Sequence, residues 1–204
     1  MDAAELEIFY TALSVGQTDG LECVGAFPGC WVGEEDGLNA RWALEAMRVP
    51  HVWAIAEANG RPARGEGIVV AQPDTGITRH AELAGIKLVA PRNLLGGKKD
   101  DPTDSLPMHG NPGHGTSTAS VLASPESLEI SGSAPAAKLM PIRAIESVVR
   151  LSQLKVAQAI DHDVNNGAHV ITMSLGGITS LSLWMALSRA VDASVIVMAA
   201  AAAG

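Results

Sequence analysis

The sequence predicts an α/β fold, a parallel β-sheet with helices on both faces. Short runs of apolar and β-branched residues alternate along the chain with stripes of apolar residues at helical spacing, and the connections between them are short. Strands that alternate with helices in this way pair in parallel. The composition agrees, because 47% of the 204 residues are hydrophobic and 18% are charged, which is typical of a globular domain with a sizeable core.

Four stretches are expected to form strands: 67–73, 138–145, 169–174 and 194–201. The first, GIVVAQP, is a short apolar run rich in β-branched residues, which is typical of a buried strand. The second contains Pro141, which has no N–H to donate to a ladder and therefore favours an edge strand or a bulge.

Helices are expected where bulky residues recur at helical spacing. These stretches are 41–53, 151–164 and 181–191. Gly167 provides a stop for the second of them. The intervening stretch 59–66, NGRPARGE, is a turn by composition.

Charge argues against nucleic acid as a partner. The formal net charge is −8, whereas phosphate binding calls for a basic patch. The only cationic cluster, 92–99, is followed at once by Asp100, Asp101 and Asp104, so we interpret this stretch as a solvated loop.

Neither a membrane segment nor a secretion signal is expected. No window reaches the ~18 apolar residues of a membrane span, and the first ten residues, MDAAELEIFY, lack the basic and apolar regions of a signal peptide. The two cysteines, Cys23 and Cys30, fit either a disulfide or two free thiols. No histidine stands near them in sequence, which argues against a metal site there.

Asp74 directly follows the first expected strand. In open α/β sheets, sites form beyond the carboxyl ends of the strands, which here points to Asp74, to 174–177 and to the residues after Ala201. The tripeptide Asp-Thr-Gly also begins ordinary turns, and it occurs in aspartic proteases, where two carboxylates share a proton. That second alternative needs an all-β context and a second such segment, and neither DTG nor DSG recurs in the chain.

His114 stands between Gly113 and Gly115, immediately before a helical stretch of small residues at 116–123, TSTASVLA. A lone histidine at this place is more typical of an ordinary helix start. Small residues, however, let a helix pack tightly in a crowded centre, so that a histidine at its start is held rigidly and remains reachable. That placement suits a general base.

Three motifs together resemble the subtilisin-like serine proteases. VVAQPDTGITRHAEL (69–83) is similar to the family's aspartate motif, GHGTSTASVLAS (113–124) to its histidine motif, and ITMSLGG (171–177) to its substrate-strand motif. They occur in the family's order, Asp before His. The resemblance runs from about Trp42 to the end of the chain.

The resemblance implies a role for each matching residue. Asp74 would accept the imidazole N–H of His114, which would take the proton of a serine hydroxyl and pass it to the leaving amine. Gly113 and Gly115 would keep the surroundings of the ring open. Ser174, Leu175 and Gly176 would form an extended edge that pairs with the backbone of a peptide or protein substrate.

Two catalytic parts of the family pattern are missing. The nucleophile lies in a G-T-S motif that opens a later helix, and no such motif follows Gly177. The oxyanion-hole asparagine should follow the last strand, where the sequence reads AAAAAG. Either the chain ends before it, or an alanine, Ala202 or Ala203, replaces it. We therefore interpret 41–204 as the N-terminal part of a catalytic domain, truncated at its C-terminal end, with the missing part as a possible partner.

Two further alternatives stay open. A non-catalytic relative would keep the peptide-docking strand and cleave nothing. Residues 1–40 are either the end of a propeptide or an extension. The resemblance requires no cofactor, but members of the family often bind calcium. The oxygens of Asp100, Asp101 and Asp104 are candidate calcium ligands. The simpler interpretation of these three residues is a solvated acidic loop.

Overall fold

The computed structural model describes residues 42–104, 112–126, 131–147, 149–150, 152–178 and 180–200. The expectations for Cys23, Cys30, the first forty residues and the last four therefore lie outside the described residues. The helices are α2 (Trp42–Ala46), α3 (Val49–Ala58), the 3-10 turn η1 (Ala81–Leu83), α4 (His114–Ala123), α5 (Leu154–Asn165) and α6 (Leu181–Asp192). The strands are β1 (Val69–Asp74), β2 (Lys87–Leu88), β3 (Arg92–Asn93), β4 (Lys138–Arg143), β5 (Val149–Arg150), β6 (Val170–Met173), β7 (Gly176–Gly177) and β8 (Ile196–Ala199).

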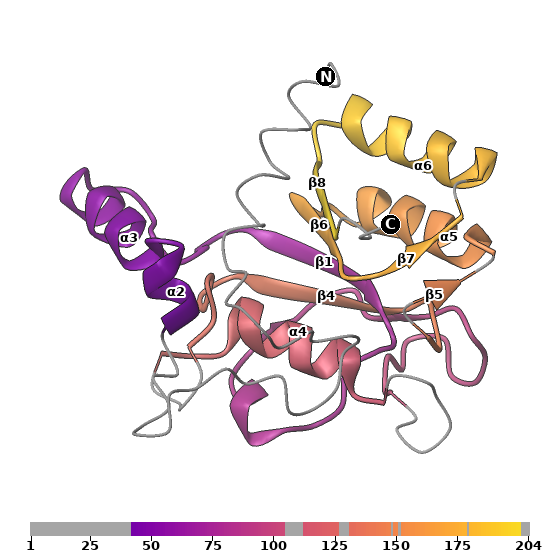
Figure 1. Cartoon of the computed structure of the whole chain (residues 1–204), viewed down its shortest axis with the longest axis horizontal. Helices are drawn as coiled ribbons and strands as arrows, with labels where there is room; N and C mark the ends of the chain where they lie inside the picture. The colour runs from indigo at the N-terminus through magenta and orange to yellow at the C-terminus, as the bar shows by residue number, and fades with distance from the viewer. Residues whose placement is uncertain are drawn as a thin grey trace, which may run out of the picture. The chain divides into compact units, whose positions relative to one another are not determined.

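The main sheet is parallel throughout and has the order β2-β4-β1-β6-β8, with β3 also paired to β4 (Figure 1). The four expected strands correspond to β1, β4, β6 and β8, so the predicted parallel α/β fold is confirmed. β1 lies at the centre between β4 and β6, and it is the strand that ends at Asp74.

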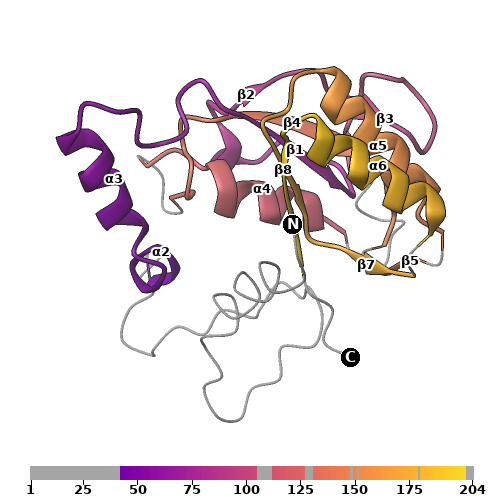
Figure 2. The same ribbon diagram turned by 90° about the horizontal axis from the view of Figure 1, so that it is seen from above.

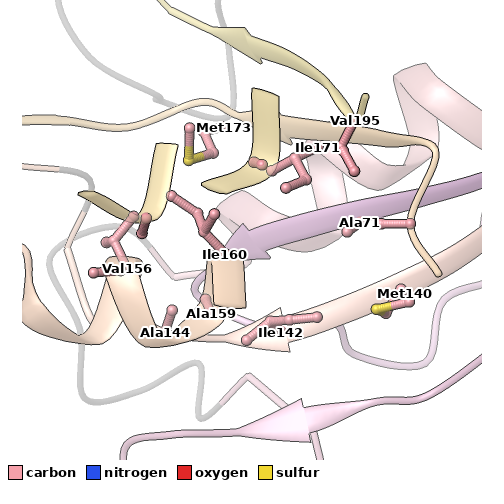
Figure 3. Packing of buried hydrophobic residues seen from close by; sticks show 14 of the residues in the cluster. Ala71, Met140, Ile142, Ala144, Val156, Ala159, Ile160, Ile171, Met173 and Val195 are labelled. Atoms are coloured by element: carbon pink, nitrogen blue, oxygen red, sulfur yellow. The ribbon is translucent and has the colours of Figure 1, made fainter. Parts of the chain in front are cut away.

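Side chains alternate across this sheet and meet different helices on its two faces. Ala71, Met140 and Ile142 pack into the main core together with α5 and α6 (Figure 3). Leu139 instead packs with Ala119 of α4. Because successive strand residues point to opposite faces, α4 and the α5–α6 pair cover opposite faces. α5 and α6 lie side by side in both ribbon views (Figures 1 and 2).

The helix expected between residues 41 and 53 is instead two helices, α2 and α3. The break falls at Arg48, which has the left-handed φ of 58°, and α3 has Pro50 in its first turn. A proline is accommodated in the first turn of a helix but not in a helix interior, because its ring clashes with the preceding turn. The position of Pro50 thus explains why one helix cannot run through.

Pro141 does not lie at an edge, as the sequence suggested, but inside β4, which pairs with β1 on one side and with β2 and β3 on the other. On that second side the carbonyls of Leu139 and Arg143 accept from Val89 and Leu94. Residues two apart in a strand point the same way, so the missing N–H of Pro141 faces the gap between β2 and β3. The proline therefore removes no ladder hydrogen bond.

Two other expectations are only partly right. Arg92 and Asn93 form β3 instead of belonging to a loop, whereas 96–101 are exposed as expected. The expected stripe of Leu181, Trp184, Leu187 and Val191 forms a helix. Leu187 packs against the core, as do the buried Ala186 and Ala190, but the other three members of the stripe are exposed. Among the described helices, none has the length and apolar character needed to span a bilayer.

Asp163, on α5, is an acidic residue whose side chain is buried. It is fully buried, and neither carboxylate oxygen has a hydrogen-bond partner within the described residues. Desolvation by burial raises the pKa of this carboxyl from its ordinary 3.8 to about 8.

We expect the stability of the chain to fall as the pH rises from about 4 to about 8. Between these values the unfolded chain loses the Asp163 proton and the folded chain keeps it, which lowers the free energy of unfolding by up to about 1.4 kcal/mol per pH unit. The Asp163→Ala substitution should remove this slope, and the variant should be more stable than the native chain above pH 8. Urea unfolding at several pH values measures the free energy of unfolding and therefore the slope. Asp161→Asn on the same helix, which removes an exposed ion pair with Arg189, should leave the slope unchanged; equal slopes in native and Asp163→Ala chains would contradict the prediction.

Candidate active site

The side chains of Asp74 and His114 form a hydrogen bond across 40 residues of sequence. Asp74 Oδ1 lies 2.8 Å from His114 Nδ1. Asp74 is the last residue of β1 and His114 the first residue of α4, so the contact joins the carboxyl end of the central strand to the start of a helix on one sheet face. The expected proximity of these two side chains is confirmed.

The carboxylate of Asp74 is held at both oxygens. Oδ1 also accepts the N–H of Thr75 at 2.6 Å, and Oδ2 lies 3.2 Å from the hydroxyl of Thr118. The Thr118 hydroxyl in turn receives Nε2–H of Gln72 at 2.5 Å. Asp74 is 1% exposed, so these partners replace the water that an ionised carboxylate needs.

Gly113 and Gly115 allow the start of α4 to adopt its backbone geometry and to pack closely, and they do little to expose the His114 ring. Gly113 precedes α4 with a φ of 75°, and a Cβ added to Gly115 would lie 2.1 Å from the carbonyl oxygen of Gly76. The His114 side chain itself is only 9% exposed. The idea that the glycines leave the ring open is therefore wrong: they let the helix start press against the turn after β1.

Ser174, Leu175 and Gly176 follow β6, which is the neighbour of β1 in the parallel sheet, so their segment begins at the same edge as Asp74. Ser174 and Leu175 lie outside regular structure. Gly176 belongs to β7, which pairs in parallel with β5, and its carbonyl accepts from Gln153 at 3.4 Å. The proposed role of this segment in substrate binding stays a prediction.

Sequence reasoning missed the supporting residues Gln72, Thr75, Thr118 and Asp104. A signal existed for Gln72, since it is a polar residue inside an apolar strand and shares a face with Asp74, two positions on. Asp104, which the sequence suggested as an exposed acid or a calcium ligand, is buried and hydrogen-bonded to Thr75. Within the described residues, no three His, Cys, Asp or Glu side chains gather as they would around a metal ion.

We expect Gly115→Ala to destabilise the fold by about 1–3 kcal/mol, because the new methyl group would overlap the Gly76 carbonyl and push α4 off the turn. The midpoint of urea unfolding measures the loss. Ser117→Ala, an exposed position in the same helix, is the matched control and should be neutral or slightly stabilising. A Gly115→Ala chain as stable as the native one would show that the helix approaches the turn less closely than described.

Comparison with known proteins places this geometry in a family. A sequence profile of the subtilase family matches residues 65–204. Thermitase from Thermoactinomyces vulgaris is 34% identical over 165 residues, which make up 79% of this chain and 54% of that protein. Subtilisin BL from Lederbergia lenta is 32% identical over 161 residues, with coverage of 78% and 54%. The chain thus spans about half the length of these curated relatives.

Among solved structures, fervidolysin from Fervidobacterium pennivorans, a keratinolytic enzyme related to subtilisin, shares the fold with a TM-score of 0.58. The match has 24% identity and covers 86% of this chain and 28% of that one. Since the family profile matches more than half of the chain, and the Asp74–His114 pair lies at the edge where the fold forms its sites, this chain belongs to the subtilase family of serine proteases.

Proposed function

We propose that this chain contributes the acid–base half of a subtilisin-like serine endopeptidase, with His114 as general base and Asp74 as its orienting partner. The observation that carries the proposal is the 2.8 Å contact between Asp74 Oδ1 and His114 Nδ1. A base whose second nitrogen is held by a buried carboxylate is the arrangement that activates a hydroxyl nucleophile.

In this proposal each ring nitrogen of His114 has a separate role. Nδ1–H donates to the Asp74 carboxylate, which fixes the tautomer and leaves the lone pair of Nε2 to accept a proton. When Nε2 takes the proton of an attacking serine, the imidazolium that forms is stabilised by the same carboxylate. In the next step Nε2 returns this proton to the leaving amine of the cleaved peptide bond.

The nucleophile and the oxyanion-hole asparagine come, in this proposal, from a C-terminal segment of the same domain. No G-T-S motif follows Gly177 in the sequence, and the chain spans about half of its curated relatives. The serines of α4, Ser117 and Ser120, lie on the helix of the base itself. The Ser120 hydroxyl donates to the Ser117 carbonyl at 2.7 Å, so it is engaged within the helix.

The substrate class is a peptide or protein held in extended form. Ser174, Leu175 and Gly176 would offer backbone groups to it at the sheet edge that also carries Asp74. The proposal requires no cofactor for this chemistry. The described loop offers calcium no cluster of three acidic ligands, because Asp104 is turned inward.

Two rival functions lead to different outcomes. A non-catalytic peptide-binding relative would keep the Ser174–Gly176 edge and lack a nucleophile throughout, so its downstream coding sequence would contain no G-T-S motif preceded by a suitable asparagine. An aspartic protease working through Asp74 would need a second carboxylate to share a proton. Among the described residues, the hydrogen-bond partners of the Asp74 side chain are His114, Thr75 and Thr118.

The test is labelling with a fluorophosphonate probe, which reacts covalently with an activated serine. We expect the 204-residue chain to show no labelling and no peptide hydrolysis, because loss of the nucleophile in a subtilisin costs about 2 × 10⁶ in kcat. The chain extended through its downstream coding sequence, in one piece or by complementation, should gain both activities. His114→Ala in the extended chain should abolish them.

Other results would reject the proposal in distinct ways. Specific labelling of the 204-residue chain would reveal a nucleophile inside it. An extended chain that binds peptide but is never labelled would favour the non-catalytic relative. Inhibition by pepstatin-like compounds, with His114→Ala still active, would favour the aspartic alternative.

A further inference from the structure

The carboxylate of Asp104 is buried between the turn after β1 and the start of α4. Asp104 is 3% exposed. Its Oδ2 accepts two hydrogen bonds, one from the hydroxyl of Thr75 at 2.8 Å and one from the backbone N–H of Gly113 at 2.9 Å. One oxygen thus links the residue after Asp74 to the residue before His114.

The Thr75 hydroxyl extends this link to the other side of the histidine. While it donates to Asp104, it accepts the backbone N–H of Gly115 at 3.0 Å. The N–H groups at the start of a helix have no intrahelical partners and must find others. Here Asp104 and Thr75 satisfy the two that flank His114, so the backbone of the histidine is held on both sides.

The segment that carries Asp104 is itself fixed against the turn. The carbonyl of Pro102 accepts the N–H of Ile77 at 2.9 Å, and the carbonyl of Asp104 lies 3.2 Å from the hydroxyl of Thr78. A Cβ added to Gly76, whose φ is 113°, would lie 2.3 Å from the Pro102 oxygen. Asp104 therefore has little freedom to move away from the helix start.

From this network we infer that Asp104 is a positioning residue for His114, acting through Thr75 and Gly113 to hold the imidazole against Asp74. The inference rests on the proposed function, in which His114 is the base. Asp104 makes no contact with the ring. It fixes the backbone from which the ring projects, and small displacements of a catalytic group carry large costs in rate.

The hydrogen-bonding pattern of Asp104 predicts which substitution is tolerated. Only Oδ2 accepts hydrogen bonds; Oδ1 is buried without a hydrogen-bond partner in the described part of the chain. Asp104→Asn keeps one oxygen that can accept from both Thr75 and Gly113, whereas Asp104→Ala removes both hydrogen bonds. A role through geometry therefore predicts rescue by asparagine, and a role through negative charge predicts none.

The experiment observes the Nδ1 proton of His114 directly by NMR in the ¹⁵N-labelled 204-residue chain, where His114→Ala identifies the resonance. A proton shared with Asp74 gives a downfield signal that exchanges slowly with water. We expect the native chain and Asp104→Asn to show it, and Asp104→Ala to exchange this proton at least tenfold faster or to lose the signal. Thr75→Val, which removes the bridging hydroxyl at constant shape, should behave like Asp104→Ala.

Two controls separate positioning from general destabilisation. Val156→Ala removes buried volume from α5 in the main core, and Asp101→Ala removes an exposed charge from the same loop as Asp104. Both should keep the slow exchange of the native chain. If Asp104→Ala does not fold, Thr75→Val and Asp104→Asn decide the matter.

Unchanged exchange in a folded Asp104→Ala chain, or in Thr75→Val, overturns the inference, and so does loss of the signal in a folded Asp104→Asn chain. This readout needs no serine. A failure of probe labelling in the extended chain would reject the proposed function but would not change the NMR result. Failure of the proposed function and failure of the Asp104 inference are therefore distinguishable.

Discussion

The close approach of α4 to the turn after β1 is the constraint on which the site depends. Gly115 and Gly76 meet there without side chains, and any Cβ at Gly115 would overlap the Gly76 carbonyl. Because a helix and a strand end approach so closely, a carboxylate on one and an imidazole on the other come within hydrogen-bonding distance. The buried polar groups of Asp74 are then satisfied by neighbours from both elements, which offsets the cost of removing a carboxylate from water.

The alternation of β1 determines which residues take part. Gln72 and Asp74 point to the face covered by α4, where both find partners, while Ala71 on the other face packs into the apolar core with α5 and α6. One strand therefore supplies polar groups to the site and apolar groups to the core at consecutive positions. The strand order also brings the segment after β6 to the same edge of the sheet. Because β1 pairs with β6 in parallel, the carboxyl end of β1 lies beside that of β6, which leads into Ser174.

The order of strands and helices could be predicted from the sequence because apolar periodicity reports on burial of whole elements. The Asp74–His114 pair could be predicted because three motifs stood in family order. The support by Asp104 could not, since it depends on a loop folding back onto a turn 29 residues earlier, which no local pattern encodes. The place of Pro141 was misjudged for a similar reason, because the gap between β2 and β3 that accommodates it exists only in the assembled sheet. The stripe predicted for α6 shows the limit of periodicity, because it identified the helix but only Leu187 of its four residues packs against the core.

The described side-chain hydrogen bonds of Asp74, His114 and Asp104 join residues between 74 and 118, from the end of β1, the turn after it, the 102–104 segment and the first turns of α4. None of these contacts involves β8 or α6, the elements nearest to the C-terminal end of the described chain. The Asp74–His114 hydrogen bond and the side-chain hydrogen bonds that support it thus come from one stretch of the chain. A nucleophile delivered by any later segment would meet a base whose orientation is already set, and preorganisation of this kind reduces the structural rearrangement that the reaction itself requires.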